Sequence, residues 1–319
     1  MFPLRNSRSL IVVLACAVLW TSGLSADESG RGIWNIDLEN DMWGNGDDGH
    51  YTHGTEISRR AANPPDWLKK FAGRLPCGPC RNPSAVGYEF GQSIYTPNDT
   101  SRSSLIAADR PYAGWLYLGA RLLKETQTPN GARTDTIGLQ LGMIGPAAFA
   151  DRTQVRIHEH RKLSMPRGWQ HQLRNEAGFV LHYRRSWDEA PQQGFGFGAT
   201  PYVMGTLGNV QTHLAGGVTF RAGFNLGKGE TSRRRSTPSW HVFLGMEGRG
   251  VARNILLDGN TWTESHRVEK RPVVGELQAG VSFTGAGLEI KITQTIRSRE
   301  FYGQLEPDRY GSVSFTYRP

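Results

Sequence analysis

The chain has 319 residues, a formal net charge of +8 and a mean hydropathy of −0.47, and it is rich in glycine and tryptophan. No stretch after residue 26 is apolar for the length that a membrane-spanning helix needs, which excludes a helical membrane protein. A membrane β-barrel and a secreted β-rich protein both remain, because strands that alternate between apolar and polar residues give no hydrophobic window.

The first 26 residues have the pattern of a secretory signal peptide. Two arginines precede an apolar run from Leu10 to Trp20, and small residues lead to a predicted cleavage site after Ala26. Cys16 raises lipidation as an alternative, although the apolar run continues beyond it. We expect an exported chain whose residues 27–319 form one domain.

Apolar and polar residues alternate along the rest of the chain. Near the end, for example, Val313, Phe315 and Tyr317 interleave with Ser314 and Thr316. A two-residue period predicts half-buried strands rather than helices. The expected strands lie near 31–40, 50–60, 85–95, 111–122, 133–143, 176–187, 194–206, 212–226, 237–250, 271–283, 286–298 and 308–318. Because the count of twelve is even, the expected fold is an all-β, antiparallel transmembrane β-barrel.

Successive connections between these strands lie on opposite rims of the barrel. If both chain ends face the periplasm, alternate connections face outside, at 41–49, 96–110, 144–175, 207–211, 251–270 and 299–307. The long connection at 144–175 contains a predicted short helix from Phe149 to Leu163, whereas an insertion at 61–84 falls on the opposite rim. Features of the first three outer connections can therefore converge on one site.

The first outer connection is rich in oxygen-bearing side chains. It is entered through Glu39-Asn40-Asp41, carries Asp47 and Asp48, and is left through His50-Tyr51-Thr52-His53. Such oxygens suit a hard cation, and Ca²⁺ takes six to eight of them. A solvated polar turn would have the same composition, so both interpretations stay open.

The predicted helix in the 144–175 connection carries a candidate base. Gln154 and His158 are four residues apart and therefore share one helix face. A histidine near a bound cation is a natural general base, because its ordinary pKa lies close to working pH. An ordinary surface histidine is the alternative. Zinc is disfavoured, because His160 does not share that face and the chain has no His-Glu-x-x-His motif.

Cys77-Gly78-Pro79-Cys80 matches the thioredoxin redox motif, but it lies among prolines in a loop instead of opening a helix after a strand. In an exported chain we expect a local disulfide between Cys77 and Cys80 that holds the 61–84 insertion.

The excess positive charge lies on predicted outer connections. These residues are Arg152, Arg156, Arg161, Lys162, Arg167, Arg253, Arg267, Lys270 and Arg271. Such a rim would attract outer-membrane lipid headgroups or the phosphates of lipopolysaccharide, and solvated loop charges would look the same. Export and a barrel fold argue against nucleic acid, and nothing indicates an obligate protein partner.

Several motifs also occur in a familiar order. They are Glu39-Asn40-Asp41, Tyr51-Thr52-His53-Gly54, Asp109 to Trp115, Gly145-Pro146, Gln154 to His158, and Gly168 to Glu176. Together they resemble the lipid A 3′-O-deacylase family, LpxR, over most of the mature chain and most densely between residues 39 and 176.

The resemblance implies a carboxylic ester hydrolase in the outer membrane of a Gram-negative bacterium, with its site facing the outer leaflet. Members use Ca²⁺ to hydrolyse the ester that holds the 3′ acyloxyacyl chain of lipid A in lipopolysaccharide. Their site lies between the barrel wall and an outer-loop helix. By motif, His158 would activate water, Gln154 would lie beside it, and Thr52 would be a polar active-site residue.

The resemblance also implies a calcium side with Asn40 and Asp41, and it suggests Arg110 as the basic substrate contact. The chain departs from the family pattern at two places. His53 stands where the family commonly has asparagine, and Ser164 stands about where an acidic residue should follow the catalytic histidine.

Two other functions stay open. An outer-membrane phospholipase would share the barrel, calcium and ester chemistry, but it normally uses a serine nucleophile, and no outer-loop serine has an evident histidine and amide partner. A non-catalytic, porin-like or surface-binding barrel is the alternative from a different class.

Overall fold

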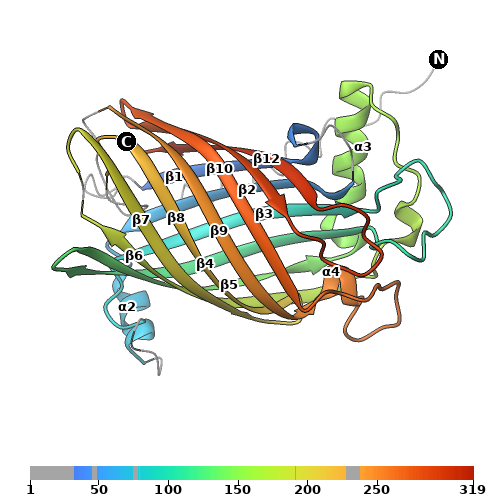
Figure 1. Ribbon diagram of the computed structural model, residues 1–319. Coiled ribbons are helices and arrows are strands. Elements are labelled where there is room, and N and C mark those ends of the chain that lie inside the picture. Colours follow the sequence, from blue (N-terminus) through green and yellow to red (C-terminus); the bar gives the residue numbers. More distant parts are fainter. Residues whose placement is uncertain (1–31, 45–48, 75–77, 79, 191, 228–237) are drawn as a thin grey trace, which may run out of the picture. The chain divides into compact units, whose positions relative to one another are not determined.

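The computed structural model describes residues 32–44, 49–74, 78, 80–190, 192–227 and 238–319. Within this part, twelve antiparallel strands form a closed barrel in which each strand pairs with its neighbours in sequence and β12 pairs with β1 (Figure 1). The predicted twelve-stranded barrel is confirmed. The strands are β1 (Ile33–Asn40), β2 (His50–Ala62), β3 (Ala85–Thr96), β4 (Ala113–Thr128), β5 (Gly131–Ile144), β6 (Glu176–Glu189), β7 (Phe195–Leu207), β8 (Gln211–Phe224), β9 (Ser239–Asn254), β10 (Val273–Gly285), β11 (Leu288–Arg297) and β12 (Asp308–Tyr317).

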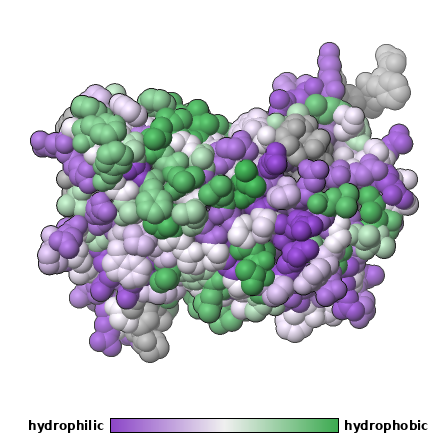
Figure 2. Space-filling view, viewed as in Figure 1, coloured by the Kyte–Doolittle hydropathy of each residue, from purple (hydrophilic) through white to green (hydrophobic). Residues whose placement is uncertain are grey.

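The two-residue period places apolar side chains on the outside of the barrel. On β11, Leu288, Ile292 and Ile296 are exposed, whereas Thr293 and Thr295 between them are buried. Apolar residues recur over the outer face of the strands in Figure 2. An apolar outside and a polar inside are the arrangement that a bilayer requires of a barrel.

Ion pairs and hydrogen bonds cross the barrel interior. Arg121 lies 3.4 Å from Glu89 and 3.6 Å from Glu56, and Tyr117 donates a 2.8 Å hydrogen bond to Glu56. Further along the barrel, the Arg297 Nε lies 2.8 Å from Glu276. Because these side chains bridge different strands, they fill parts of the lumen with polar contacts.

The helices lie at the two ends of the barrel. The long helix α3 (Ala150–Arg161) confirms the helix predicted in the 144–175 connection, and it lies at the opposite barrel end from α2 (Asp66–Arg74) (Figure 1). We call these the α3 end and the α2 end. Three single turns, η1 (Asp41–Trp43), η2 (Pro146–Ala148) and η3 (Trp169–His171), and the short α4 (Ile255–Asp258) complete the helical elements of the described residues. No described helix has the length and apolar character to cross a membrane.

Sequence patterns missed α2 and the full length of β4. The insertion at 61–84 was expected to be a loop, but nine of its residues form α2. Strand β4 continues to Thr128, beyond the expected residue 122, because Thr128 pairs with Gly131 and the ladder runs up to a tight turn.

Cys80 is disulfide-bonded and fully buried. Its predicted partner, Cys77, lies outside the described residues, as do the signal peptide, with Cys16 and Ala26, and the acidic pair Asp47 and Asp48.

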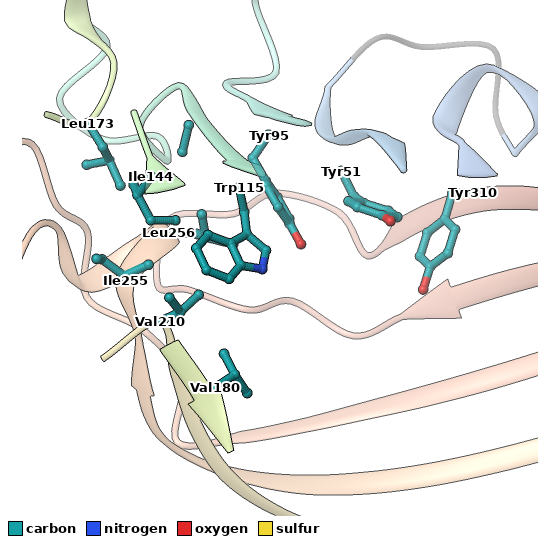
Figure 3. Close-up of a cluster of buried hydrophobic side chains, with 11 residues drawn as sticks. Tyr51, Tyr95, Trp115, Ile144, Leu173, Val180, Val210, Ile255, Leu256 and Tyr310 are labelled. Atoms are coloured by element: carbon teal, nitrogen blue, oxygen red, sulfur yellow. The ribbon is translucent and has the colours of Figure 1, made fainter. Parts of the chain in front are cut away.

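A buried apolar cluster closes the barrel beneath the loops of the α3 end (Figure 3). Tyr51 contacts the rings of Tyr95 and Tyr310 at centroid distances of 5.2 and 4.9 Å. Trp115 lies between this row and an aliphatic group that includes Ile144 and Leu173. The cluster contains residues of both the strand ends and the connections at the α3 end, so its packing holds those connections in place.

Candidate active site

Helix α3 lies against the barrel wall, over β3 and β4. Gly114 of β4 makes this close approach possible. A Cβ atom at Gly114 would lie 2.4 Å from the Ala150 Cβ and 3.0 Å from the Ala148 Cβ. The Gln92 side chain on β3 also donates a 2.6 Å hydrogen bond to the Ala148 carbonyl. Small residues on both sides therefore set the distance between the helix and the wall.

The chain enters α3 through a turn that the motif residues build. Gly145 has a φ of +88°, a left-handed conformation that favours glycine, and its N–H donates to the Gly114 carbonyl at 3.2 Å. The Asn175 side chain accepts a 2.7 Å hydrogen bond from the Ala147 N–H. Gly114, Gly145 and Asn175, far apart in the sequence, thus meet where the helix begins.

His158 lies on the buried face of α3, with 5% of its surface exposed. Its Nδ1 is 2.6 Å from the main-chain carbonyl oxygen of Ser164. A carbonyl oxygen only accepts, so Nδ1 is assigned as the donor, and in the neutral ring Nε2 then carries the lone pair. Lys162 ends the helix in a left-handed conformation, with φ of 56°, and lets the chain turn back to present Ser164. This contact therefore fixes the orientation of the His158 ring and leaves Nε2 as the nitrogen that can accept a proton.

Ser164 was one of the two departures from the family pattern. The structure shows that its main-chain carbonyl, which any residue at this position would carry, holds the histidine ring. The lack of an acidic side chain therefore does not leave the ring unoriented.

Gln154 lies one turn before His158 on the same buried face. Its Oε1 accepts a 2.8 Å hydrogen bond from the indole N–H of Trp169, which fixes the orientation of the amide. Trp169 packs in turn on Tyr112, with ring centroids 4.9 Å apart. This stack belongs to a buried cluster with Ile94 and Ala150, so α3, β3 and the connection after α3 hold Gln154 together.

Asn40, Asp41 and Thr52 form a second cluster, at the turn between β1 and β2. The side-chain oxygens of Asn40 and Asp41 both accept from the Met42 N–H, at 3.1 and 2.8 Å. The second carboxylate oxygen of Asp41 accepts from the Gly49 N–H at 2.7 Å. The Asn40 amide donates to the Thr52 carbonyl at 2.9 Å. The two side-chain oxygens therefore converge on one point of the turn.

Strand β3 links the two clusters. The Thr52 hydroxyl lies 2.8 Å from the Thr96 hydroxyl at the end of β3, and α3 packs on the same strand. His53, the other departure from the family pattern, has its Nε2 2.7 Å from the Thr55 hydroxyl. Among the described residues, no three or more histidines, cysteines or acidic residues form a group that could hold a metal ion.

Arg110 lies inside the α3 end rather than at an open surface. It is 0% exposed, its Nη1 donates to Glu300 at 3.2 Å, and its guanidinium carbon lies 4.6 Å from the ring centre of Tyr95. Burial opposes the charge on Glu300, but the guanidinium groups of Arg297 and Arg110 outweigh it and lower the pKa of this carboxyl group. The proposed contact between Arg110 and substrate remains a prediction.

A histidine to which the sequence analysis gave no separate role joins three connections of the α3 end. The two ring nitrogens of His50 lie 2.6 Å from Asp308 and 3.4 Å from Asp109. Burial opposes the charged form of Asp109, but hydrogen bonds from His50 and from the Asn98 N–H outweigh it and lower its pKa. Residues 50, 109 and 308 meet only because the barrel closes, so no local pattern could have revealed this contact.

An apolar depression lies beside the Trp169 stack. Its lining includes Leu105, Ile106, Tyr112 and Gly168. A Cβ atom at Gly168 would lie 2.4 Å from the Tyr112 ring, so glycine is required for the close approach. The outer connections therefore offer apolar surface next to the buried face of α3.

A closed antiparallel barrel with an apolar outside, a polar core and a helix packed across one end defines an outer-membrane β-barrel protein. The sequence profile of the family described as outer membrane protein LpxR matches residues 10–319, and the chain belongs to this family. A comparison with curated protein sequences finds no match.

One of the solved structures compared with this chain shows the same fold. LpxR from Salmonella typhimurium has a TM-score of 0.72 and 22% sequence identity, and the match covers 89% of this chain and 99% of that chain. The KdgM porin in complex with disordered oligogalacturonate has a TM-score of 0.36 and 6% identity, over 90% and 97% of the two chains. The translocator domain of the autotransporter NalP from Neisseria meningitidis has a TM-score of 0.38 and 10% identity, over 97% and 98%.

Proposed function

We propose that this protein is a calcium-dependent hydrolase that removes the 3′-linked acyloxyacyl chain from lipid A. Family membership supports this reaction. The observation that carries the proposal is the buried face of α3, where Gln154 is held by Trp169 and His158 is held through Nδ1. A preorganised base beside the barrel wall is what hydrolysis of a membrane-embedded ester needs.

In the proposed reaction, Nε2 of His158 takes a proton from a water molecule whose oxygen forms a bond with the ester carbonyl carbon. As the bond between that carbon and the sugar oxygen breaks, the same proton passes to the sugar oxygen. The products are a free acyloxyacyl acid and a sugar hydroxyl. Gln154 supplies a fixed amide beside the base, and Thr52 supplies a polar group on the facing wall.

The turn after β1 fits calcium by the chemistry of its donors. Asn40 and Asp41 would hold the ion, because their side-chain oxygens are hard donors on the same turn and include a buried carboxylate. Carbonyl, hydroxyl or water oxygens would complete the shell. When bound, calcium supplies a positive charge that polarises the ester carbonyl and stabilises the developing negative charge.

The exposed face of α3 supports an anionic substrate. Arg152 and Arg156 are exposed and four residues apart, on the side of the helix away from Gln154 and His158. Like charges at this spacing destabilise a helix, so the pair favours a role in binding anions. The phosphates of lipid A, displayed at the outer leaflet, are anions of this kind.

The decisive experiment compares two histidines of α3. We expect His158→Ala to abolish release of the acyloxyacyl chain, as measured by mass spectrometry of lipid A from expressing cells. His160→Ala is the matched control, because His160 is exposed on the other side of the same helix. Heat-modifiable migration on a gel checks that both variants fold. Unchanged lipid A with the wild-type protein and calcium, or full activity of a folded His158→Ala protein, would contradict the proposal.

The two alternatives have their own tests. Phospholipid vesicles and lipid A supplied side by side distinguish a phospholipase from a lipid A deacylase. The ion pairs that cross the barrel interior argue against a conducting porin. We therefore expect no steady ion conductance in planar bilayers.

A further inference from the structure

Helix α2 presents two large aromatic side chains that the protein does not cover. Trp67 is 66% exposed and Phe71 is 54% exposed. The two residues are four positions apart, so they lie on one face of the helix. Paired exposed aromatic side chains indicate a surface that contacts something other than water.

Basic residues flank this aromatic pair on the same side. Lys70 and Arg74 each follow an aromatic residue by three positions, and both are exposed. Neither forms a salt bridge with a residue in the part of the chain that the structure describes. Lys69, on the other side of the helix, lies 3.2 Å from Asp66. The charges available for an external partner are therefore next to the aromatic pair.

The opposite face of α2 is turned inward. Leu68 is half-buried and Ala72 is fully buried, four residues apart. The insertion also contains Cys80, which is fully buried and disulfide-bonded. Because this face of the helix is turned inward, the aromatic and basic side chains face outward.

The aromatic residues of the strands mark the level of the membrane boundary at this end. Exposed Trp34 pairs in register with exposed Tyr317, and exposed Phe224 pairs with exposed Trp240. Such belts lie at the headgroup level in outer-membrane barrels. Trp34 pairs with Arg59, and β2 ends three residues later at Ala62, just before the segment that leads into α2. Figure 1 shows α2 at this end of the barrel, below the strands in this view.

We propose that Trp67, Lys70, Phe71 and Arg74 form an interfacial surface that binds anionic phospholipid headgroups of the leaflet at the α2 end, which strand parity assigns to the periplasm. The aromatic rings enter the boundary between headgroups and acyl chains, and the basic groups reach the phosphates. Each Lys or Arg near an anionic surface changes binding about fivefold. This surface is separate from α3, so it does not depend on the proposed hydrolase.

The test uses the mature barrel in nanodiscs that contain brominated phosphatidylcholine, with or without phosphatidylglycerol. Trp67→Phe is measured in parallel, and subtraction of its emission isolates the contribution of Trp67. We expect bromine to quench this contribution, and phosphatidylglycerol to strengthen the quenching. Lys70→Gln and Arg74→Gln should each lower the ratio of docked to undocked helix about fivefold, and high salt should act in the same direction.

Lys69→Gln is the matched control, because it removes one positive charge from the other side of the same helix, and it should leave quenching unchanged. Trp67 emission that bromine does not quench in either lipid mixture would overturn the proposal. Equal losses in Lys69→Gln and Lys70→Gln would also overturn it. If Trp67 is shielded from bromine only in discs that hold two barrels, the surface binds a second copy of the chain instead of lipid.

Discussion

Gly114→Ala tests how closely α3 must approach the barrel wall. Gly114 lies in β4, and its neighbours across the contact are the side chains of Ala148 and Ala150 at the start of the helix. The substitution adds one methyl group and removes no polar group. It therefore perturbs only the distance between the wall and the helix that carries Gln154 and His158.

The structure gives the size of the perturbation. The new Cβ would lie 2.4 Å from the Ala150 Cβ, about 1 Å short of the 3.4 Å at which ordinary contact begins. Neither methyl group can rotate out of the way, so the backbone of the helix or of the strand must move. Overpacking of this kind costs about 1–3 kcal/mol of stability. A catalytic group displaced by about 1 Å can lose roughly 100-fold in rate.

The assay follows lipid A deacylation over time for folded protein in the presence of calcium. Gly248→Ala is the control, because Gly248 is an exposed strand glycine with no atom near its added Cβ. We expect a drop of about 100-fold in kcat for Gly114→Ala and no change for the control. A folded Gly114→Ala protein with wild-type kcat would refute the link between helix position and rate.

Three further results are expected. Trp169→Phe removes the indole N–H that donates to Gln154, so it should lower kcat. It should also lower the free energy of unfolding, measured with urea in liposomes, by about 1–3 kcal/mol. Unchanged values of both would contradict this role. Chelation with EGTA should abolish deacylation, and added calcium should restore it. The Asp41→Asn variant should need more calcium than the wild-type protein for half-maximal activity. Turnover that resists the chelator would argue against calcium. Because the pKa of folded Asp109 is lowered, its contribution to stability is complete above its unfolded pKa of about 3.9 and is lost as pH falls through the folded pKa. The protection factors of amide hydrogens in the 96–110 connection, which compare their exchange with the intrinsic rate at the same pH, should therefore fall on acidification, and Asp109→Asn should remove that dependence.

The candidate site shows how far local patterns extend. Spacing placed Gln154 and His158 on one helix face, because the helical repeat is a local property, and both residues are buried on α3. The carbonyl of Ser164 that orients His158 could not be predicted, because every residue carries a carbonyl and only the turn after α3 selects this one. The resemblance suggested Arg110 as the basic substrate contact, but it did not reveal that Arg110 is buried beside Glu300 of the 299–307 connection.

The sequence by itself determined the strands and the two faces of each, because two-residue alternation sorts side chains between lipid and lumen, and their even count predicted the barrel that the structure shows to be closed. It also determined which connections share a rim, since parity follows from strand count alone. Only the tertiary structure decided the contacts that join distant segments. His50 meets Asp109 and Asp308, and Gly114 meets Ala150, because barrel closure and loop packing bring together residues that no local pattern relates.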